Sequence, residues 1–184
     1  KPILEHSIDP KRKDKEGVIQ VWEFPPSNRA TYGVYWAGVD IVKDSESINS
    51  PSMNVIHIYK GAHNMREEDK EKIIVAKYMS RPKDKMEWFE KAMMLMEWYN
   101  AEALVENNVN WFIEEAIKIK KQHRIAKTPQ WVRDMTPQGT SYQTKPYGVV
   151  TTPKLIEKIL DVVSKYLKEP IYTEYNEETG QPTI

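Results

Sequence analysis

The first half of the chain contains four runs of hydrophobic residues that predict strands: VIQVWEF (18–24), ATYGVYWAGVDIV (30–42), SMNVIHIYK (52–60) and EKIIVAKYM (71–79). In the second run, Val34, Trp36 and Gly38 alternate with Tyr35, Ala37 and Val39 in the period of two that strands show. The β-branched and aromatic content of the four runs is typical of strands. The polar connectors between the later runs contain Pro51, Gly61 and Asn64, which favour turns. The pattern predicts an antiparallel meander.

The period then changes from two to that of a helix. Between Asp84 and Tyr99, apolar residues recur at helical spacing, and Asp84 with Glu87 has the arrangement of a capping box. The apolar face contains Met86, Phe89, Met93 and Met96. We interpret this methionine-rich face as core packing, because methionine fills irregular gaps between side chains.

The next segments predict a short strand over 102–106 and a helix over 109–121, with Asn108 as the N-cap. The inward face of this helix is predicted to contain Val109, Phe112, Ile113, Ala116 and Ile117. Residues 122–148 are polar and rich in turn formers, which predicts a long loop or an irregular hairpin.

The last regular element is a predicted helix from Thr152 to about Leu167, with Pro153 in its first turn. Its inward face is predicted to contain Leu155, Ile156, Ile159, Leu160 and Val163. The order of strands, helix, strand, helix, loop and helix indicates an α/β protein, with helices packed on a mixed sheet.

Composition favours one domain. A chain of 184 residues with 40% hydrophobic residues has enough material for a single core. Residues 1–17 are charged and contain two prolines, so we expect an arm or linker there and the domain over 18–184. The first residue is Lys1 and the tail is polar, so we expect an excerpt that is truncated at its carboxyl end. The chain has no cysteine, which excludes disulfides and thiolate metal sites.

Charge and motifs exclude several function classes. The 27 basic and 27 acidic residues give no net field, so composition does not indicate a strongly cationic nucleic-acid binder. Phosphate-loop, dinucleotide-binding, HExxH and GxSxG motifs are absent, and the four histidines lack metal-ligand spacing. Candidate chemistry is therefore carried by carboxylates.

Asp40 and Glu106 are the two carboxylates that stand out, because each ends a hydrophobic strand, GVYWAGVD and ALVE. Mixed sheets place their ligands at the carboxyl ends of such strands. Two acids on neighbouring strands would repel each other unless a cation neutralised them, and Mg²⁺ prefers oxygen ligands. Alternatively, Asp40 is a strand-end turn residue and Glu106 only terminates its strand before the helix.

The segments YWAGVDIV, SRPKDKMEWFEKAMMLMEWYNAE and ALVENN, in this order, resemble the nuclease domain of the large terminase subunit of tailed phages. The resemblance is densest over residues 18–121, and YGVVTTPKL is similar to the segment that leads into a later helix of the family. It implies a ribonuclease H-like fold: a mixed β-sheet flanked by α-helices.

The resemblance also implies a chemistry. Asp40 would match the first metal-binding aspartate and Glu106 the second acid, and together they would help to hold two Mg²⁺ or Mn²⁺ ions that cleave a phosphodiester bond. Asp44 is a possible outer participant. The family has a third acid, usually an aspartate beyond the segment where this chain stops. Asp161 is the only late candidate here, although its place within a helix favours an exposed surface residue.

Partners follow from the same resemblance. The domain would cut concatemeric double-stranded DNA during genome packaging in the cytoplasm of an infected bacterium. In the full-length protein, an ATPase motor, the portal and the small terminase subunit would be its partners. Phosphate contacts would fall to basic residues near the site. The candidates are Lys43, Lys127, Arg133 and Lys145.

Two other functions fit the same residues. One is another ribonuclease H-like nuclease, of the junction-resolvase or integrase type. The other is a non-catalytic scaffold or interaction domain that retains the fold. Substrate preference separates the first from a terminase nuclease, and ion-dependent stabilisation separates the second.

Overall fold

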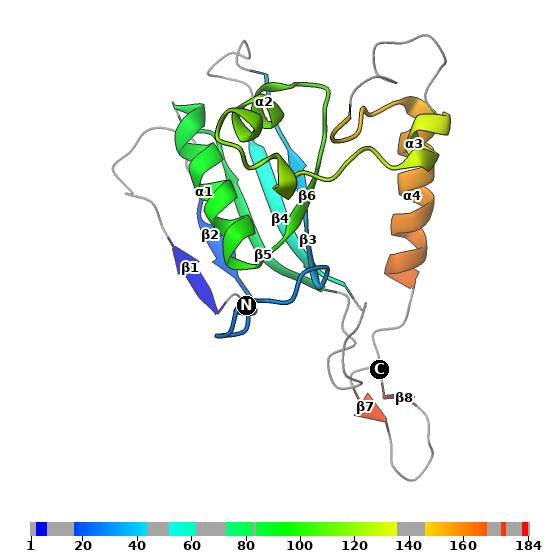
Figure 1. Ribbon diagram of the computed structural model, residues 1–184. Helices are drawn as coiled ribbons and strands as arrows, with labels where there is room; N and C mark the ends of the chain where they lie inside the picture. The colour runs from blue at the N-terminus through cyan, green and yellow to red at the C-terminus, as the bar shows by residue number, and fades with distance from the viewer. Residues whose placement is uncertain are drawn as a thin grey trace.

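The computed structural model describes residues 3–6, 17–43, 52–61, 73–82, 84–135, 146–168, 174–175 and 182–183. Within these residues, six strands form one sheet in the order β1-β2-β5-β4-β3-β6 (Figure 1). They are β1 (Leu4–His6), β2 (Ile19–Val21), β3 (Tyr35–Asp40), β4 (Asn54–Lys60), β5 (Ile73–Ser80) and β6 (Glu102–Val105). β3 pairs parallel with β6, and the other pairs of this sheet are antiparallel. The chain is therefore an α/β protein with a mixed sheet, as predicted.

The predicted meander is confirmed for β3, β4 and β5, which pair antiparallel in sequence order. β2 does not pair with β3. It pairs with β5, on the side of β5 away from β4. The reason is that β6 occupies the free edge of β3. Within the segment predicted as an arm, β1 extends the sheet by pairing with β2.

Four helices and one short turn follow or interrupt the strands in the described part of the chain. They are α1 (Lys85–Trp98), α2 (Trp111–Lys118), a 3-10 turn (Gln122–Arg124), α3 (Gln130–Met135) and α4 (Pro153–Lys168). A separate two-stranded hairpin contains β7 (Glu174–Tyr175) and β8 (Pro182–Thr183). The predicted start of α1 is confirmed, because the Asp84 carboxylate accepts a hydrogen bond from the Met86 N–H at 2.8 Å.

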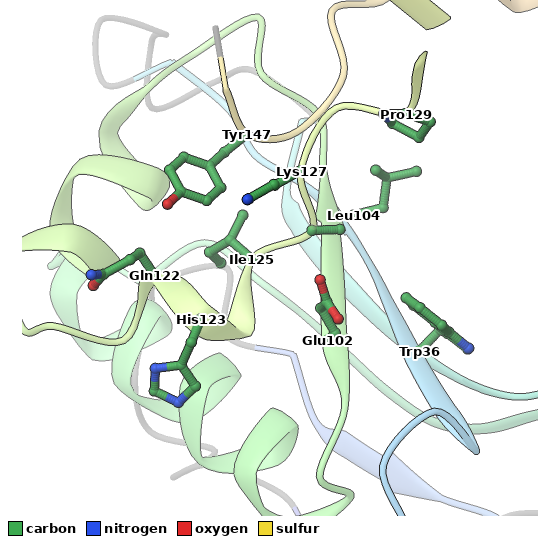
Figure 2. Close-up of a pocket in the computed structure, with 10 residues that line it drawn as sticks. Trp36, Glu102, Leu104, Gln122, His123, Ile125, Lys127, Pro129 and Tyr147 are labelled. Carbon is green, nitrogen blue, oxygen red and sulfur yellow. The ribbon is translucent and has the colours of Figure 1, made fainter. Parts of the chain in front are cut away.

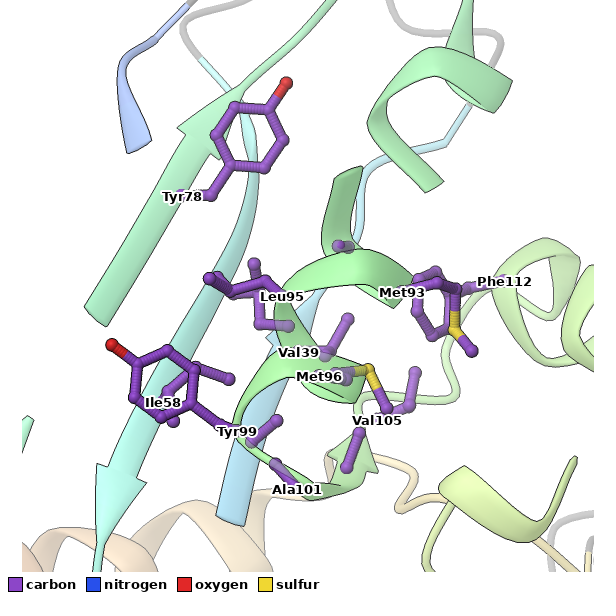
Figure 3. Packing of buried hydrophobic residues seen from close by; sticks show 14 of the residues in the cluster. Val39, Ile58, Tyr78, Met93, Leu95, Met96, Tyr99, Ala101, Val105 and Phe112 are labelled. Carbon is purple, nitrogen blue, oxygen red and sulfur yellow. The ribbon is translucent and has the colours of Figure 1, made fainter. Parts of the chain in front are cut away.

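The hydrophobic core lies between α1, α2 and one face of the sheet (Figures 1 and 3). Met93 and Met96 are buried in it, so the methionine-rich face of α1 packs in the core as predicted. The Phe112 ring of α2 lies edge-on to Trp88 and Phe89 of α1, with ring centroids 5.8 Å and 5.0 Å apart. This aromatic contact joins the two helices above the strands that carry the candidate acids.

The opposite face of the sheet is open at β3 and β6. Burial alternates along β3. Tyr35, Ala37 and Val39 enter the core, and the residue after each of them, including Trp36 and Asp40, is exposed. Trp36 is 41% exposed, and Leu104 of β6 is 36% exposed. The two candidate acids therefore lie on the face that α1 and α2 leave uncovered.

Two details of the predicted helix over 109–121 are wrong. The helix begins at Trp111 with Asn110 as its N-cap, so Asn108 does not cap it. Ile117 is 46% exposed, whereas Phe112, Ile113 and Ala116 are buried as predicted. The helix ends at Lys118, and its last turn extends past the core.

The predicted inward face of the last helix is also wrong. Leu155 is buried, but its four predicted partners, Ile156, Ile159, Leu160 and Val163, are exposed. Figure 1 shows α4 beside α3, apart from α1 and α2. Helical spacing of apolar residues identifies an amphipathic helix but does not say which surface it packs on. None of the helices in the described residues is both long and apolar enough to cross a membrane.

Candidate functional site

The parallel pairing of β3 with β6 brings Asp40 beside Glu106. Val39 lies opposite Val105 in the register, and the Glu106 N–H donates to the Val39 carbonyl at 2.8 Å. The next position along this register places the two acids side by side. Because side chains alternate between faces, both carboxyls project from the open face at the same end of the sheet.

The backbone just after Asp40 is fixed on both sides. The Val42 N–H donates to the Asn54 side-chain carbonyl at 2.9 Å, and the Val42 carbonyl accepts from the Trp111 indole N–H at 3.2 Å. Asn54 and Trp111 are both largely buried. These contacts fix the chain that follows β3, which restricts the positions available to Asp40.

Two side chains hold the Glu106 carboxylate. Asn108 Nδ2 donates to Glu106 Oε1 at 2.6 Å, and the Thr151 hydroxyl donates to the same oxygen. The Thr151 N–H donates to Asn108 Oδ1 at 3.1 Å. Asn108 thus binds the predicted metal ligand instead of capping a helix.

Thr151 reaches the site because residues 147–150 run beside the end of β6. The Val149 N–H donates to the Val105 carbonyl at 2.8 Å, and the Asn107 N–H donates to the Val149 carbonyl at 2.6 Å. Gly148 lies directly against β6, with a φ of +71°. A Cβ at Gly148 would lie 2.5 Å from the Val105 carbonyl oxygen. The close approach therefore requires glycine at this position.

Contacts within residues 122–148, the predicted loop or irregular hairpin, hold Tyr147 and Gly148 in place. Lys127 and Tyr147 form an antiparallel bridge, as in a hairpin, and the Thr128 hydroxyl donates to the Gly148 carbonyl at 2.7 Å. The same region contains α3, which the sequence did not indicate. The stretch 136–145 lies outside the described residues.

Partial burial and the neighbouring Glu106 raise the pKa of the Asp40 carboxyl. Partial burial of the carboxyl, its hydrogen bond with Glu106 and the negative charge of Glu106 raise the pKa of Asp40 to about 6. The site therefore holds two carboxyls at close range, where one proton or one cation would relieve their repulsion.

The chemistry of these groups fits a hard divalent cation. Within the described part of the chain, neither Asp40 nor Glu106 forms an ion pair with a lysine or arginine. Paired carboxylate oxygens, unbalanced by protein cations, suit Mg²⁺ or Mn²⁺. No third aspartate, glutamate or histidine joins them among the residues that the structure describes. Asp40 and Glu106 are therefore suited to bind one ion that keeps several of its water ligands.

Of the other two predicted metal ligands, only Asp161 is described, and it is not brought to this pair. Asp44 lies outside the described residues. Asp161 is exposed on α4, where it forms an ion pair with Lys165 at 2.9 Å. That ammonium lowers the pKa of the Asp161 carboxyl. Asp161 also lies nine residues beyond Thr152, about 14 Å along the helix axis. It is a surface residue, in agreement with the first interpretation of the sequence.

Of the predicted DNA-contacting residues, three are described. Lys43 is exposed three residues after Asp40, and Lys127 is exposed beside Tyr147. Arg133 lies on α3, where its Nε donates to the Thr128 carbonyl at 3.3 Å. Lys145 lies outside the described residues.

A cavity of about 650 Å³ lies beside β3 and β6, on the same face as the acids. Trp36 and Leu104 line it together with Ile125, Lys127 and Tyr147 (Figure 2). Trp36 precedes Asp40 by four residues, which corresponds to about 13 Å along the strand. The cavity is mostly apolar, and neither Asp40 nor Glu106 lines it, although Leu104 lies two residues before Glu106.

The sequence indicated both acids but missed their partners. Thr151 comes from 45 residues further along the chain, and no local pattern links it to Glu106. The available signal was Gly148 in the segment YGVVTTP, since a glycine before a helix start marks a close backbone approach or a turn.

Comparison with known proteins gives no family assignment. No protein-family model matches this chain, and no curated protein sequence matches it.

Replacement of Gly148 by alanine should destabilise the protein more than the same change at Gly33. Both glycines have positive φ, but a Cβ at Gly33 meets nothing within 4 Å. We expect Gly33→Ala to lower the free energy of unfolding by about 1–2 kcal/mol from backbone strain. For Gly148→Ala, overlap with the Val105 carbonyl should bring the loss to about 3 kcal/mol or more. Urea unfolding measures both, and equal losses would contradict the close approach.

The contribution of Asp40 to the stability of the metal-free protein should fall as pH rises from 4 to above 6. The pKa of Asp40 is raised in the folded state from 3.8 to about 6. Its protonated form therefore favours folding at low pH, and this contribution is lost as pH passes the folded pKa. Because Asp40 is exposed, solvent screening should reduce the change to about 1 kcal/mol.

Asp40→Asn should remove this component of the pH dependence, whereas Asp161→Asn should retain it. Urea unfolding in the presence of a chelator at several pH values provides the measurement. An undiminished fall in Asp40→Asn would show that Asp40 is not its source.

Proposed function

We propose that this chain is a metal-dependent DNA endonuclease domain with a ribonuclease H-like fold, of the kind found in large terminase subunits of tailed phages. The observation that carries the proposal is the placement of Asp40 beside Glu106 at the ends of neighbouring parallel strands. The sheet order supports it, since the antiparallel strands β5, β4 and β3 are followed by the parallel strand β6. Such a sheet is compatible with ribonuclease H-like topology.

Asp40 and Glu106 would hold the metal, and the resemblance implies two ions. Bound Mg²⁺ or Mn²⁺ would supply the Lewis acidity that activates water and stabilises the leaving oxygen. The protein's own contribution is a pair of oxygen ligands on a rigid sheet edge, with Glu106 held by Asn108 and Thr151. A second ion would need an acidic ligand beyond those that the described residues bring to the pair.

Double-stranded DNA is the proposed substrate. Lys43 follows the site in sequence, and Lys127 is exposed near the segment that carries Thr151, so both are candidates for phosphate contacts, with Arg133 and Lys145 as further ones. In a full-length terminase, the domain would act with an ATPase motor, the portal and the small subunit in the infected bacterial cytoplasm.

Plasmid cleavage in Mn²⁺ provides the test. Asp40→Asn and Glu106→Gln should each lower the rate about 100-fold or more, since a lost metal ligand removes several kcal/mol of charge stabilisation. Asp161→Asn is the matched control, because Asp161 pairs with Lys165 away from the site, and it should cleave like the wild type. Mn²⁺ should also raise the melting temperature of the wild type but not that of Asp40→Asn.

The outcomes separate the alternative functions. Cleavage of linear and supercoiled duplex supports the terminase type, whereas a strong preference for four-way junctions supports a resolvase. No cleavage together with no stabilisation by Mn²⁺ would favour a non-catalytic interaction domain. Unchanged cleavage in Asp40→Asn would refute the assigned site.

A further inference from the structure

Thr151, Asn108 and Glu106 form a closed set of hydrogen bonds. Asn108 Nδ2 and the Thr151 hydroxyl both donate to Oε1 of Glu106, and the Thr151 N–H donates to Asn108 Oδ1. The backbone hydrogen bond fixes which way the Asn108 amide faces, so its NH₂ group is directed to the carboxylate. Glu106 is thereby held in one orientation by two residues that are not acids.

Asn108 and Thr151 both donate to the same oxygen of the Glu106 carboxylate, Oε1. A carboxylate oxygen has two lone pairs, and Oε1 uses both of them on Asn108 and Thr151. Within the described residues, the Oε2 atom of Glu106 receives no hydrogen bond from an amide or hydroxyl donor. Oε2 is therefore the oxygen left to act with Asp40.

We propose that Thr151 and Asn108 are positioning residues that hold the Glu106 carboxylate in the orientation in which it would bind the metal. The inference rests on the proposed metal site and extends it to residues that do not touch the ion. Partners of metal ligands fix the orientation of the ligand and raise its affinity, and their loss typically costs 10–100-fold in metal affinity.

Thr151 is itself held from both sides, which suits it to this role. On its amino-terminal side, Val149 is paired with β6, and Gly148 allows the close approach. On its carboxyl-terminal side, the Thr152 hydroxyl accepts the Leu155 N–H at 3.2 Å and starts α4. The hydroxyl of Thr151 is thus presented to Glu106 by a backbone with little freedom to move.

Mn²⁺ affinity of the 184-residue chain, measured by calorimetric titration and by electron paramagnetic resonance of free Mn²⁺, tests the proposal. Thr151→Val keeps the shape of the side chain and removes its donor, so we expect about 10–100-fold weaker binding. Thr151→Ser retains the hydroxyl and should recover affinity to within about threefold of the wild type. Asn108→Ala should weaken binding in the same range as Thr151→Val.

Thr152→Val is the matched control. It makes the same chemical change one residue away, but its hydroxyl caps α4 and does not contact Glu106. We expect a lower melting temperature with unchanged Mn²⁺ affinity. A folded Thr151→Val protein that binds Mn²⁺ as tightly as the wild type would overturn the proposal, as would failure of Thr151→Ser to recover affinity.

The two proposals fail in different ways. Wild-type protein that binds Mn²⁺ but cleaves no DNA would refute the nuclease function, and the affinities of the variants would still decide the positioning role. Wild-type protein that binds no Mn²⁺ would overturn both.

Discussion

The parallel register between β3 and β6 determines the rest of the site. The hydrogen bond from the Glu106 N–H to the Val39 carbonyl aligns the two strand ends, so that Asp40 and Glu106 project side by side from one face. A shift of one residue in either strand would send one acid into the core and the other to solvent. The register is protected because the alternate residues Ala37, Val39, Ala103 and Val105 are buried beneath the helices.

The core makes this strand end rigid enough to hold two like charges together. α1 and α2 pack on the face of the sheet opposite the acids, and their aromatic contacts lie in the core on that side. Trp111 belongs to this core and also donates to the backbone just after Asp40. The hydrophobic packing therefore fixes the backbone beside Asp40, and burial together with the nearby Glu106 raises the pKa of the Asp40 carboxyl.

Local sequence patterns predicted the elements that carry the acids. The period-two alternation in β3 and the helical period of α1 both correspond to observed burial, and the placement of each acid at a strand end was predicted from the hydrophobic run before it. The position of β2 could not be predicted, since it depends on β6 taking the edge of β3. The partners of the apolar residues of α4 are likewise set by tertiary packing, which the spacing of those residues does not encode.

The residues around Glu106 show a second limit of prediction. Asn108 has a side chain equally suited to cap a helix and to bind a carboxylate, and the helix predicted to begin at the next residue favoured the first interpretation. Only the arrival of Thr151 from a distant segment decides between them. A site assembled from segments far apart in the chain can be predicted at its strand ends but not at the contacts that orient it.

Anomalous diffraction near the manganese absorption edge, from crystals of the chain grown with Mn²⁺, would test the central claim most directly. The predicted result is a manganese peak bound by carboxylate oxygens of both Asp40 and Glu106. A map without manganese at this pair, in crystals where Mn²⁺ is ordered elsewhere, would contradict the claim that the β3–β6 register builds a metal site.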